Sequence, residues 1–306
     1  MRLDGPRVKT EEDMPGVSLA GADQTRAEAL ASGWNRAGLI GYALLGGVAI
    51  FVVGTPYSEF TPANDSLFYN GVLVAAFALL ALVLRGRPSL ALYAACNIAL
   101  LVGATAMLVL VAGPFDWLIT AEEGSVQEAF QGKLAEFLAV VPAILVLTLV
   151  ARRPWGWVFL QKGRPKRWLI FGLSWFGITA VVIAGLALAS GIDAAELLAA
   201  APWIVAFAAL NAVMEELWFR GIFLRPYSSA MGGVQAVVVT AFIFAGAHLG
   251  ATYLASIGEL VLLVVGASAI GLVAAWAMRW ADALWGSVLF HMGLDLLVVF
   301  GLLESV

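Results

Sequence analysis

The stretch SLALYAACNIALLVGATAMLVLVAG, residues 89–113, contains 25 residues and no charged side chain. A membrane-spanning α-helix needs roughly 17 to 25 mostly apolar residues to cross the hydrocarbon core of a bilayer. Arg85 and Arg87 lie shortly before this stretch and Asp116 shortly after it, so charged residues bound it on both sides. The stretch therefore predicts one complete membrane span and sets the pattern by which its neighbours can be recognised.

The same pattern recurs along the chain, which is 62% hydrophobic and only 12% charged. An ordinary soluble domain has about 25% charged residues, so this composition excludes a water-soluble surface. We expect an all-α, polytopic transmembrane helical bundle of about nine membrane helices, with eight as the alternative count. The predicted spans lie near residues 37–54, 66–84, 89–113, 133–151, 167–190, 196–224, 235–253, 257–278 and 284–303.

Positive charge predicts the orientation of these helices. Of the 17 lysines and arginines, all except Lys133 fall in the amino-terminal tail or in alternate loops, which therefore lie on one side of the membrane. Basic residues concentrate on the cytoplasmic side of membrane proteins. The amino end is therefore predicted to be cytoplasmic and, with nine spans, the carboxyl end to lie outside. A net charge of −4 gives no reason to expect nucleic acid as a partner.

The basic loop ARRPWGWVFLQKGRPKR, residues 151–167, divides the chain into unequal parts. Residues 1–34 are polar, without the apolar core of a secretory signal, and are expected to form a flexible cytosolic tail. Residues 35–155 form the predicted amino-terminal membrane helices, whose polar residues are few. Residues 165–306 form a second bundle that holds nearly every ionisable group within the spans, so function is expected there, at 203–300. The single cysteine, Cys96, excludes an internal disulfide.

One predicted helix, WIVAFAALNAVMEELWFRGIF at residues 203–223, carries adjacent carboxylates. Charged side chains inside a membrane cost about 2.5 to 3.5 kcal/mol each, so they require a reason. Glu216 and Arg220 are four residues apart, which favours an ion pair on one helix face. Glu215 points about 100° away and stays free to act, and Asn211, one turn earlier, could donate a hydrogen bond to it. The structural alternative is a solvated helix end.

Both histidines of the chain fall in predicted membrane helices. His248 lies in TAFIFAGAHLGA, residues 240–251, four residues after Phe244. His291 lies in GSVLFHMGLDLLVVF, residues 286–300, four residues before Asp295, which could fix its tautomer or share a proton or a metal with it. A packing histidine and a private histidine–aspartate hydrogen bond are the structural alternatives for the two sites.

A carboxylate with two imidazoles in a poorly hydrated cavity can activate water for hydrolysis of an amide. The same side chains could bind a divalent metal such as zinc, with Glu215, His248, His291 and Asp295 as candidate ligands. The residues leave the metal-bound and metal-free alternatives open. The sequence contains no HExxH helix, and no serine or cysteine fits a triad with these histidines, so water is the expected nucleophile.

Three strings carry a family resemblance: EELWFR with Glu215, Glu216 and Arg220, FAGAH ending at His248, and HMGLD from His291 to Asp295. Their order resembles the EExxxR, FxxxH and HxxxN/D motifs of the CPBP family of intramembrane proteases, which includes the type II CAAX prenyl endopeptidases. The resemblance implies a multi-pass intramembrane (metallo)endopeptidase in the plasma membrane of a prokaryotic cell. It also implies membrane lipids as partners and a peptide or protein substrate, prenylated or membrane-anchored.

By this resemblance, Glu215 and His248 activate the attacking water, and His291 and Asp295 stabilise the oxyanion. Glu216, Arg220, Asn211 and Phe244 are the supporting residues. The better-understood CAAX enzymes have asparagine where this chain has Asp295, and an ionised carboxylate cannot donate to an oxyanion. Asp295 must therefore be protonated, orient His291 or bind a metal.

Two other function classes compete with the protease. A proton- or ion-coupled transporter could use the same acids and histidines as a relay. It predicts inverted repeats and a polar path across the bilayer, but the sequence shows no repeat and the first helices offer few polar residues. A catalytically silent membrane scaffold could retain the three motifs for packing alone.

Overall fold

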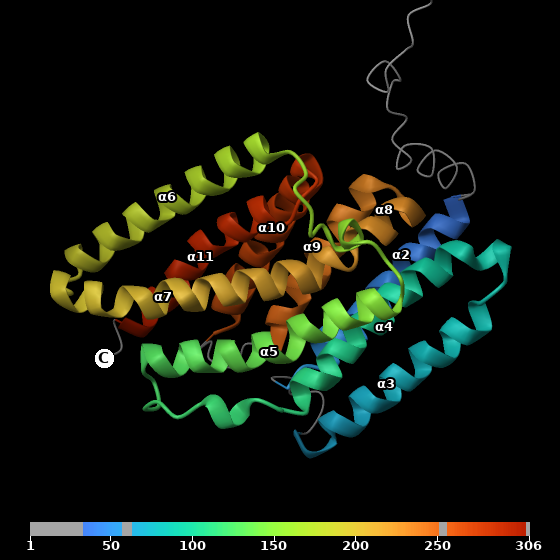
Figure 1. Cartoon of the computed structure of the whole chain (residues 1–306), viewed down its shortest axis with the longest axis horizontal. Helices are drawn as coiled ribbons and strands as arrows, with labels where there is room; N and C mark the ends of the chain where they lie inside the picture. The colour runs from blue at the N-terminus through green and yellow to red at the C-terminus, as the bar shows by residue number, and fades with distance from the viewer. Residues whose placement is uncertain (1–32, 57–62, 251–255, 304–306) are drawn as a thin grey trace, which may run out of the picture.

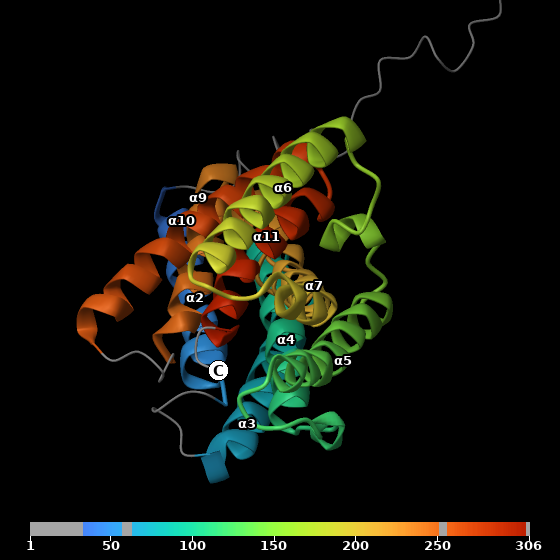
Figure 2. The same ribbon diagram turned by 90° about the vertical axis from the view of Figure 1, so that its left-hand side faces the viewer.

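The structure is a computed structural model that describes residues 33–56, 63–250 and 256–303. Most of the predicted tail, residues 1–34, lies outside this described part, as do positions 251–253 of one predicted span. The described residues contain nine continuous helices and no strand. They confirm the predicted all-α bundle, which Figures 1 and 2 show from two directions.

The helices follow the predicted spans closely. In chain order they are α2 (Gly33–Val48), α3 (Ala63–Leu84), α4 (Ala91–Val111), α5 (Val126–Val150), α6 (Pro165–Ala189), α7 (Ala194–Glu215), α8 (Leu224–Met231), α9 (Gly233–Ala247), α10 (Ile257–Ala281) and α11 (Trp285–Leu303). Helix α2 continues as the π-helical turn η2 (Ala49–Val53). Helix α7 continues through the π-helical turn η6 (Glu216–Gly221) into α8.

Seven helices within the described residues are long and apolar enough to cross a membrane, and α9, with 15 residues, is shorter. Large apolar side chains cover the outside of the bundle, among them Phe68 at 76% exposure and Val181 at 73%. An apolar exterior of this kind would be costly in water and suits hydrocarbon. Inside hydrocarbon, an α-helix satisfies its backbone groups within one segment. The chain is therefore a multi-pass membrane protein.

Helices from both sides of the basic loop pack together. Helix α4 contacts α8, α2 contacts α9, and α5 contacts α7. Helix α11 lies against α6, α7 and α10, as Figures 1 and 2 show together. The contact with α6 is close, because a Cβ added at Gly172 would lie 2.7 Å from the Cβ of Leu289 and one at Gly293 would lie 2.2 Å from the Thr179 hydroxyl. Small residues at helix contacts allow this approach in membrane proteins.

An aromatic cluster joins three elements in the core. Phe51 of η2 packs against Phe219 of η6, with ring centroids 4.6 Å apart, and Phe219 packs against Phe244 of α9 at 5.2 Å. Edge-to-face and tilted ring pairs of this kind add stability beyond the apolar area that they bury. The cluster fixes η6 and α9, the two elements that carry the first two motifs, relative to each other.

The structure corrects three predicted boundaries. Helix α5 begins at Val126, before the predicted start at residue 133, so Lys133 lies within this helix and not in a loop. The helix that begins at Ala194 runs on to Met231, beyond the predicted end at residue 224. Helix α9 ends at Ala247, so His248 begins a 3₁₀ turn, η7 (His248–Gly250), instead of lying inside a helix. The Nδ1–H of His248 donates to the Phe244 carbonyl oxygen, and its backbone amide is directed to Ala245 and Gly246. The side chain of His248 thus donates to the carbonyl oxygen that would accept from the backbone amide of His248 if the α-helix continued.

Candidate active site

The two adjacent glutamates lie where a helix changes its winding. Glu215 is the last residue of α7, and Glu216 is the first residue of the π-helical turn η6. Turns of this type are rare and occur frequently at functional sites. The glutamates differ in environment, because Glu216 is fully buried whereas the side chain of Glu215 is 17% exposed. The buried and the accessible carboxylate therefore face different partners.

Glu216 forms the predicted ion pair with Arg220. Nη1 of Arg220 donates to Oε1 of Glu216 at 2.8 Å, and neither side chain has any exposure. The charge pattern assigns Arg220 to a cytoplasmic loop together with the other basic residues, but the structure places it inside the continuous helix from α7 to α8. A buried charge is costly unless it is paired, and the ion pair gives each of the two groups a counter-charge.

His291 of α11 is attached to the same glutamate. Its Nδ1–H donates to Oε1 of Glu216 at 2.8 Å, so this oxygen accepts from both Arg220 and His291. The other ring nitrogen, Nε2, lies 3.5 Å from Oε2 of Glu215 and 3.5 Å from Oδ1 of Asp295. Glu216 thus holds the imidazole in an orientation that directs Nε2 toward two further carboxyl groups.

Asn211 of α7 has a partner that we did not expect. We predicted a hydrogen bond to Glu215, one turn along its own helix. Instead, Nδ2 of Asn211 donates to Oδ2 of Asp295 at 3.2 Å. The reason is tertiary, because α11 packs against α7 and brings Asp295 within reach. Asp295 therefore lies between Asn211 on one oxygen and His291 on the other.

The ring of Phe244 connects the remaining members of the site. The guanidinium carbon of Arg220 lies 3.9 Å from its centroid, a cation–π contact in a desolvated place. The rings of His248 and His291 both approach it edge-on, with centroid distances of 4.7 and 5.7 Å. From the sequence we predicted Phe244 as a supporting residue, but we did not predict the roles of Phe219, which packs against Phe244, and Phe51, which packs against Phe219. Nothing in the spacing of these residues could have revealed them.

His248 is half-buried and lies at the edge of this cluster. Since a carbonyl oxygen can only accept, Nδ1 of His248 carries the hydrogen in its bond to Phe244, and the neutral ring then has its lone pair on Nε2. Within the described residues its contacts to the cluster run through the Phe244 ring, with no hydrogen bond to Glu215, His291 or Asp295. The structure thus brings Glu215, Glu216, Arg220, His291 and Asp295 into direct contact and places His248 beside them.

The predicted binding of a divalent metal by Glu215, His248, His291 and Asp295 stays a prediction. Among the described residues, no three His, Cys, Asp or Glu side chains are grouped to hold a metal ion. Nδ1 of His291 is occupied by Glu216, and Nδ1 of His248 by a backbone carbonyl. The arrangement instead has the parts of an acid–base site, because an accessible carboxylate lies beside an imidazole that is itself held by a buried ion pair.

These features define a class, a polytopic membrane protein with a buried carboxylate–imidazole cluster contributed by α7, η6 and α11. Residues 197–297 match the sequence model of the family described as type II CAAX prenyl endopeptidase Rce1-like. The matched segment covers α7 through most of α11 and contains all three motifs. The match confirms the resemblance to the CPBP family over this segment, and that family is one of intramembrane proteases. No curated protein and no solved structure matches the chain.

Proposed function

We propose that the chain is an intramembrane endopeptidase in which Glu215 activates a water molecule for attack on a peptide bond. The observation that carries this proposal is the convergence of Glu215, Glu216, Arg220, His291 and Asp295 from two helices that are far apart in sequence. Glu215 has the most exposed side chain of the three carboxylates, and a general base must reach the water that it deprotonates.

The buried pair acts as a positioning device in this proposal. Glu216 accepts from both Arg220 and His291, so it holds the imidazole while the guanidinium balances its charge. Because Nδ1 of His291 is committed to Glu216, only Nε2 can face the reacting groups. Positioning of this kind contributes to rate because the donor does not need to reorganise when charge develops.

His291 supplies the proposed donor to the developing oxyanion. A protonated Nε2 directed between Glu215 and Asp295 can donate to the oxygen of a tetrahedral intermediate. Of the three roles open to Asp295, the orientation of His291 has the best support, because its second oxygen already accepts from Asn211. His248, with a free Nε2 in its neutral form, is proposed to orient the attacking water from the edge of the site.

The proposed reaction uses no metal. Glu215, His248, His291 and Asp295 are not grouped as three ligands in the described part of the chain, so no step is assigned to zinc or another divalent ion. The match to the CAAX endopeptidases supports a membrane-embedded peptide as substrate, prenylated or otherwise anchored. We place the enzyme in the plasma membrane of a prokaryotic cell, where membrane lipids surround it.

Cleavage of anchored peptides tests the proposal. Purified protein in vesicles would be incubated with fluorogenic peptides that end in a prenylated cysteine motif, and with transmembrane peptides analysed by mass spectrometry. We expect cleavage by the wild type, loss of cleavage in Glu215→Gln, and full cleavage in the matched control Glu123→Gln, which changes an exposed glutamate in the loop before α5. Wild-type turnover in Glu215→Gln would overturn the assignment of the base.

A further inference from the structure

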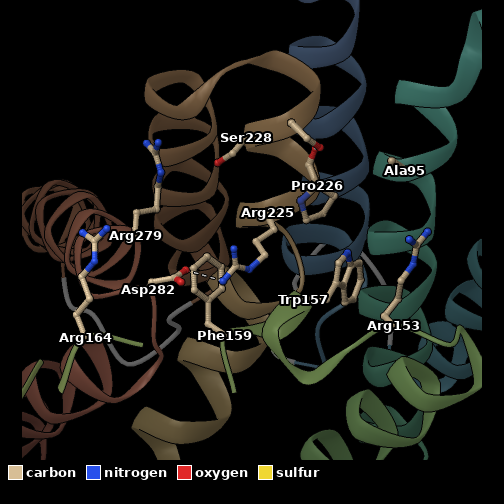
Figure 3. A pocket seen from close by; sticks show the side chains of 11 residues that line it. Ala95, Arg153, Trp157, Phe159, Arg164, Arg225, Pro226, Ser228, Arg279 and Asp282 are labelled. Carbon is tan, nitrogen blue, oxygen red and sulfur yellow. Dashed lines mark hydrogen bonds and ion pairs between the residues drawn. The ribbon is translucent and has the colours of Figure 1, made fainter. Parts of the chain in front are cut away.

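A cavity of about 530 Å³ opens at the end of the bundle where helix α8 meets two loops, the basic loop before α6 and the loop between α10 and α11. Hydrogen bonds join these loops, because the Arg164 amide donates to the Ala281 carbonyl and the Leu284 amide to the Phe159 carbonyl. The residues that line the cavity come from four segments of the chain, and Figure 3 labels all of them except Ser229: Ala95, Arg153, Trp157, Phe159, Arg164, Arg225, Pro226, Ser228, Ser229, Arg279 and Asp282. None of them belongs to the candidate active site.

One of the four arginines in the lining has its charge balanced. Nη2 of Arg225 lies 2.6 Å from Oδ1 of Asp282, and its guanidinium stacks over the ring of Phe159 at 4.1 Å. Its Nε donates to the carbonyl oxygen of Gly156. Figure 3 shows this ion pair as a dashed line between the two side chains. Arg225 therefore has a structural role in the cavity lining, and its charge is not free to attract a ligand.

The other three arginines have no carboxylate partner among the described residues. Arg164 makes only a 3.3 Å contact from Nη1 to the Trp280 carbonyl oxygen. The side chains of Arg153 and Arg279 form no ion pair or hydrogen bond within the described part of the chain. Of the described residues that line the cavity, Asp282 is the only acid, and it is paired with Arg225. Three unbalanced guanidinium groups around one cavity create a strong positive potential, which attracts an anion.

The position of Arg279 indicates which kind of anion fits the cavity. A Cβ added at Gly233 would lie 2.0 Å from Nη2 of Arg279, so this guanidinium covers the first turn of α9. The residue at the N-cap position is Gly232, which has no side chain to cap the helix. A cation beside the positive end of a helix is unfavourable by itself. An anion bound there would be stabilised by both the cation and the helix end. Arginine forks, with the hydroxyl of Ser228 beside them, suit the oxygens of a phosphate group.

The position of the cavity relative to the membrane indicates whether the phosphate belongs to a lipid headgroup or to a soluble molecule. The cavity lies at the helix ends that carry the basic loops, and one of its lining residues is a tryptophan. Trp157 lines it, Trp155 is 42% exposed nearby, and the Arg167 guanidinium lies 5.1 Å from the Trp280 ring centroid. Tryptophans mark the level of lipid headgroups, and basic pockets between membrane helices at this level bind anionic headgroups. We propose that this cavity binds the phosphate headgroup of an anionic phospholipid.

Lipid retention tests the proposal. The full chain would be extracted from vesicles of equal phosphatidylglycerol and phosphatidylcholine, and the lipids that remain bound would be counted by native mass spectrometry. We expect the wild type to retain phosphatidylglycerol preferentially and Arg153→Gln/Arg279→Gln to lower this retention roughly tenfold. The matched control is Arg85→Gln/Arg87→Gln, which removes two exposed charges between α3 and α4, outside the cavity lining. It should retain as much lipid as the wild type.

Three results would overturn the proposal. Equal loss in both double variants would show general attraction of lipid to a basic surface. Unchanged retention in Arg153→Gln/Arg279→Gln would show that the cavity is not the site. Displacement of the lipid by millimolar glycerol phosphate would identify a soluble phosphate as the ligand instead. If the double variant does not fold, the exposed Arg153→Gln alone should still lower retention roughly threefold.

Discussion

Oε1 of Glu216 accepts a hydrogen bond from Nδ1 of His291 at 2.8 Å, although 75 residues separate them in the chain. The same oxygen accepts from Arg220 at 2.8 Å, so one buried atom joins the first and third sequence motifs. This sharing separates two kinds of residue at the site. Glu216 and Arg220 hold the arrangement, whereas Glu215 and Asp295 face the open nitrogen of His291.

Glu216→Ala is expected to destabilise the protein strongly. It leaves the Arg220 guanidinium fully buried without a counter-charge, and removing one partner of a buried pair costs about 3 to 5 kcal/mol. Thermal unfolding in detergent, followed by loss of helical signal, should show a large fall in the midpoint. The control Glu123→Gln should unfold as the wild type does, and so should Glu215→Gln. Equal stability of Glu216→Ala and wild type would contradict the buried pair.

Asp295→Asn is expected to lower kcat about a hundredfold with little change in KM, because the proposed role of Asp295 is to orient His291 through a charged contact. The fold should persist, since asparagine fits the same space and can still accept from Asn211. Steady-state kinetics on the peptide substrate would measure the change. Full activity in Asp295→Asn would show that position 295 needs no charge and would shift its role toward donation to the oxyanion.

Phe244→Leu is expected to impair both stability and turnover. The ring contacts Arg220, His248 and His291, and losing a buried ring with its cation–π contact costs about 1 to 3 kcal/mol. The control is Phe242→Leu on the same helix, where the side chain is 59% exposed and lies outside the site. Unfolding midpoints and cleavage rates would be compared for the pair. Equal effects at the two positions would argue against a special role for Phe244.

Chelation should leave cleavage unchanged, because the candidate ligands are not grouped for metal binding in the described part of the chain. The measurement compares initial rates before and after prolonged dialysis against a strong chelator, with elemental analysis of the purified protein. The sample should contain metal far below one ion per chain. Loss of activity that returns on addition of zinc would restore the metal-bound alternative.

The sequence alone predicted features that depend on short separations along the chain. Uninterrupted apolar runs such as residues 89–113 predict spans, because a bilayer requires a fixed length of apolar helix. The Glu216–Arg220 pair follows from helical geometry, since residues four apart share a face. The three motif strings identified the residues of the candidate site, and the family match covers the segment that contains them.

Only the tertiary structure decided which distant groups meet. Asn211 pairs with Asp295 and not with Glu215, Phe244 links the two histidines, and His248 ends its helix. The arginines around the proposed lipid cavity come from separate segments of the chain. The physical reason is that helices apolar on every side show no periodic face by which the sequence could indicate a neighbour. In a membrane, close packing at small residues such as Gly172 and Gly293 decides which helices meet and which polar groups they bring together.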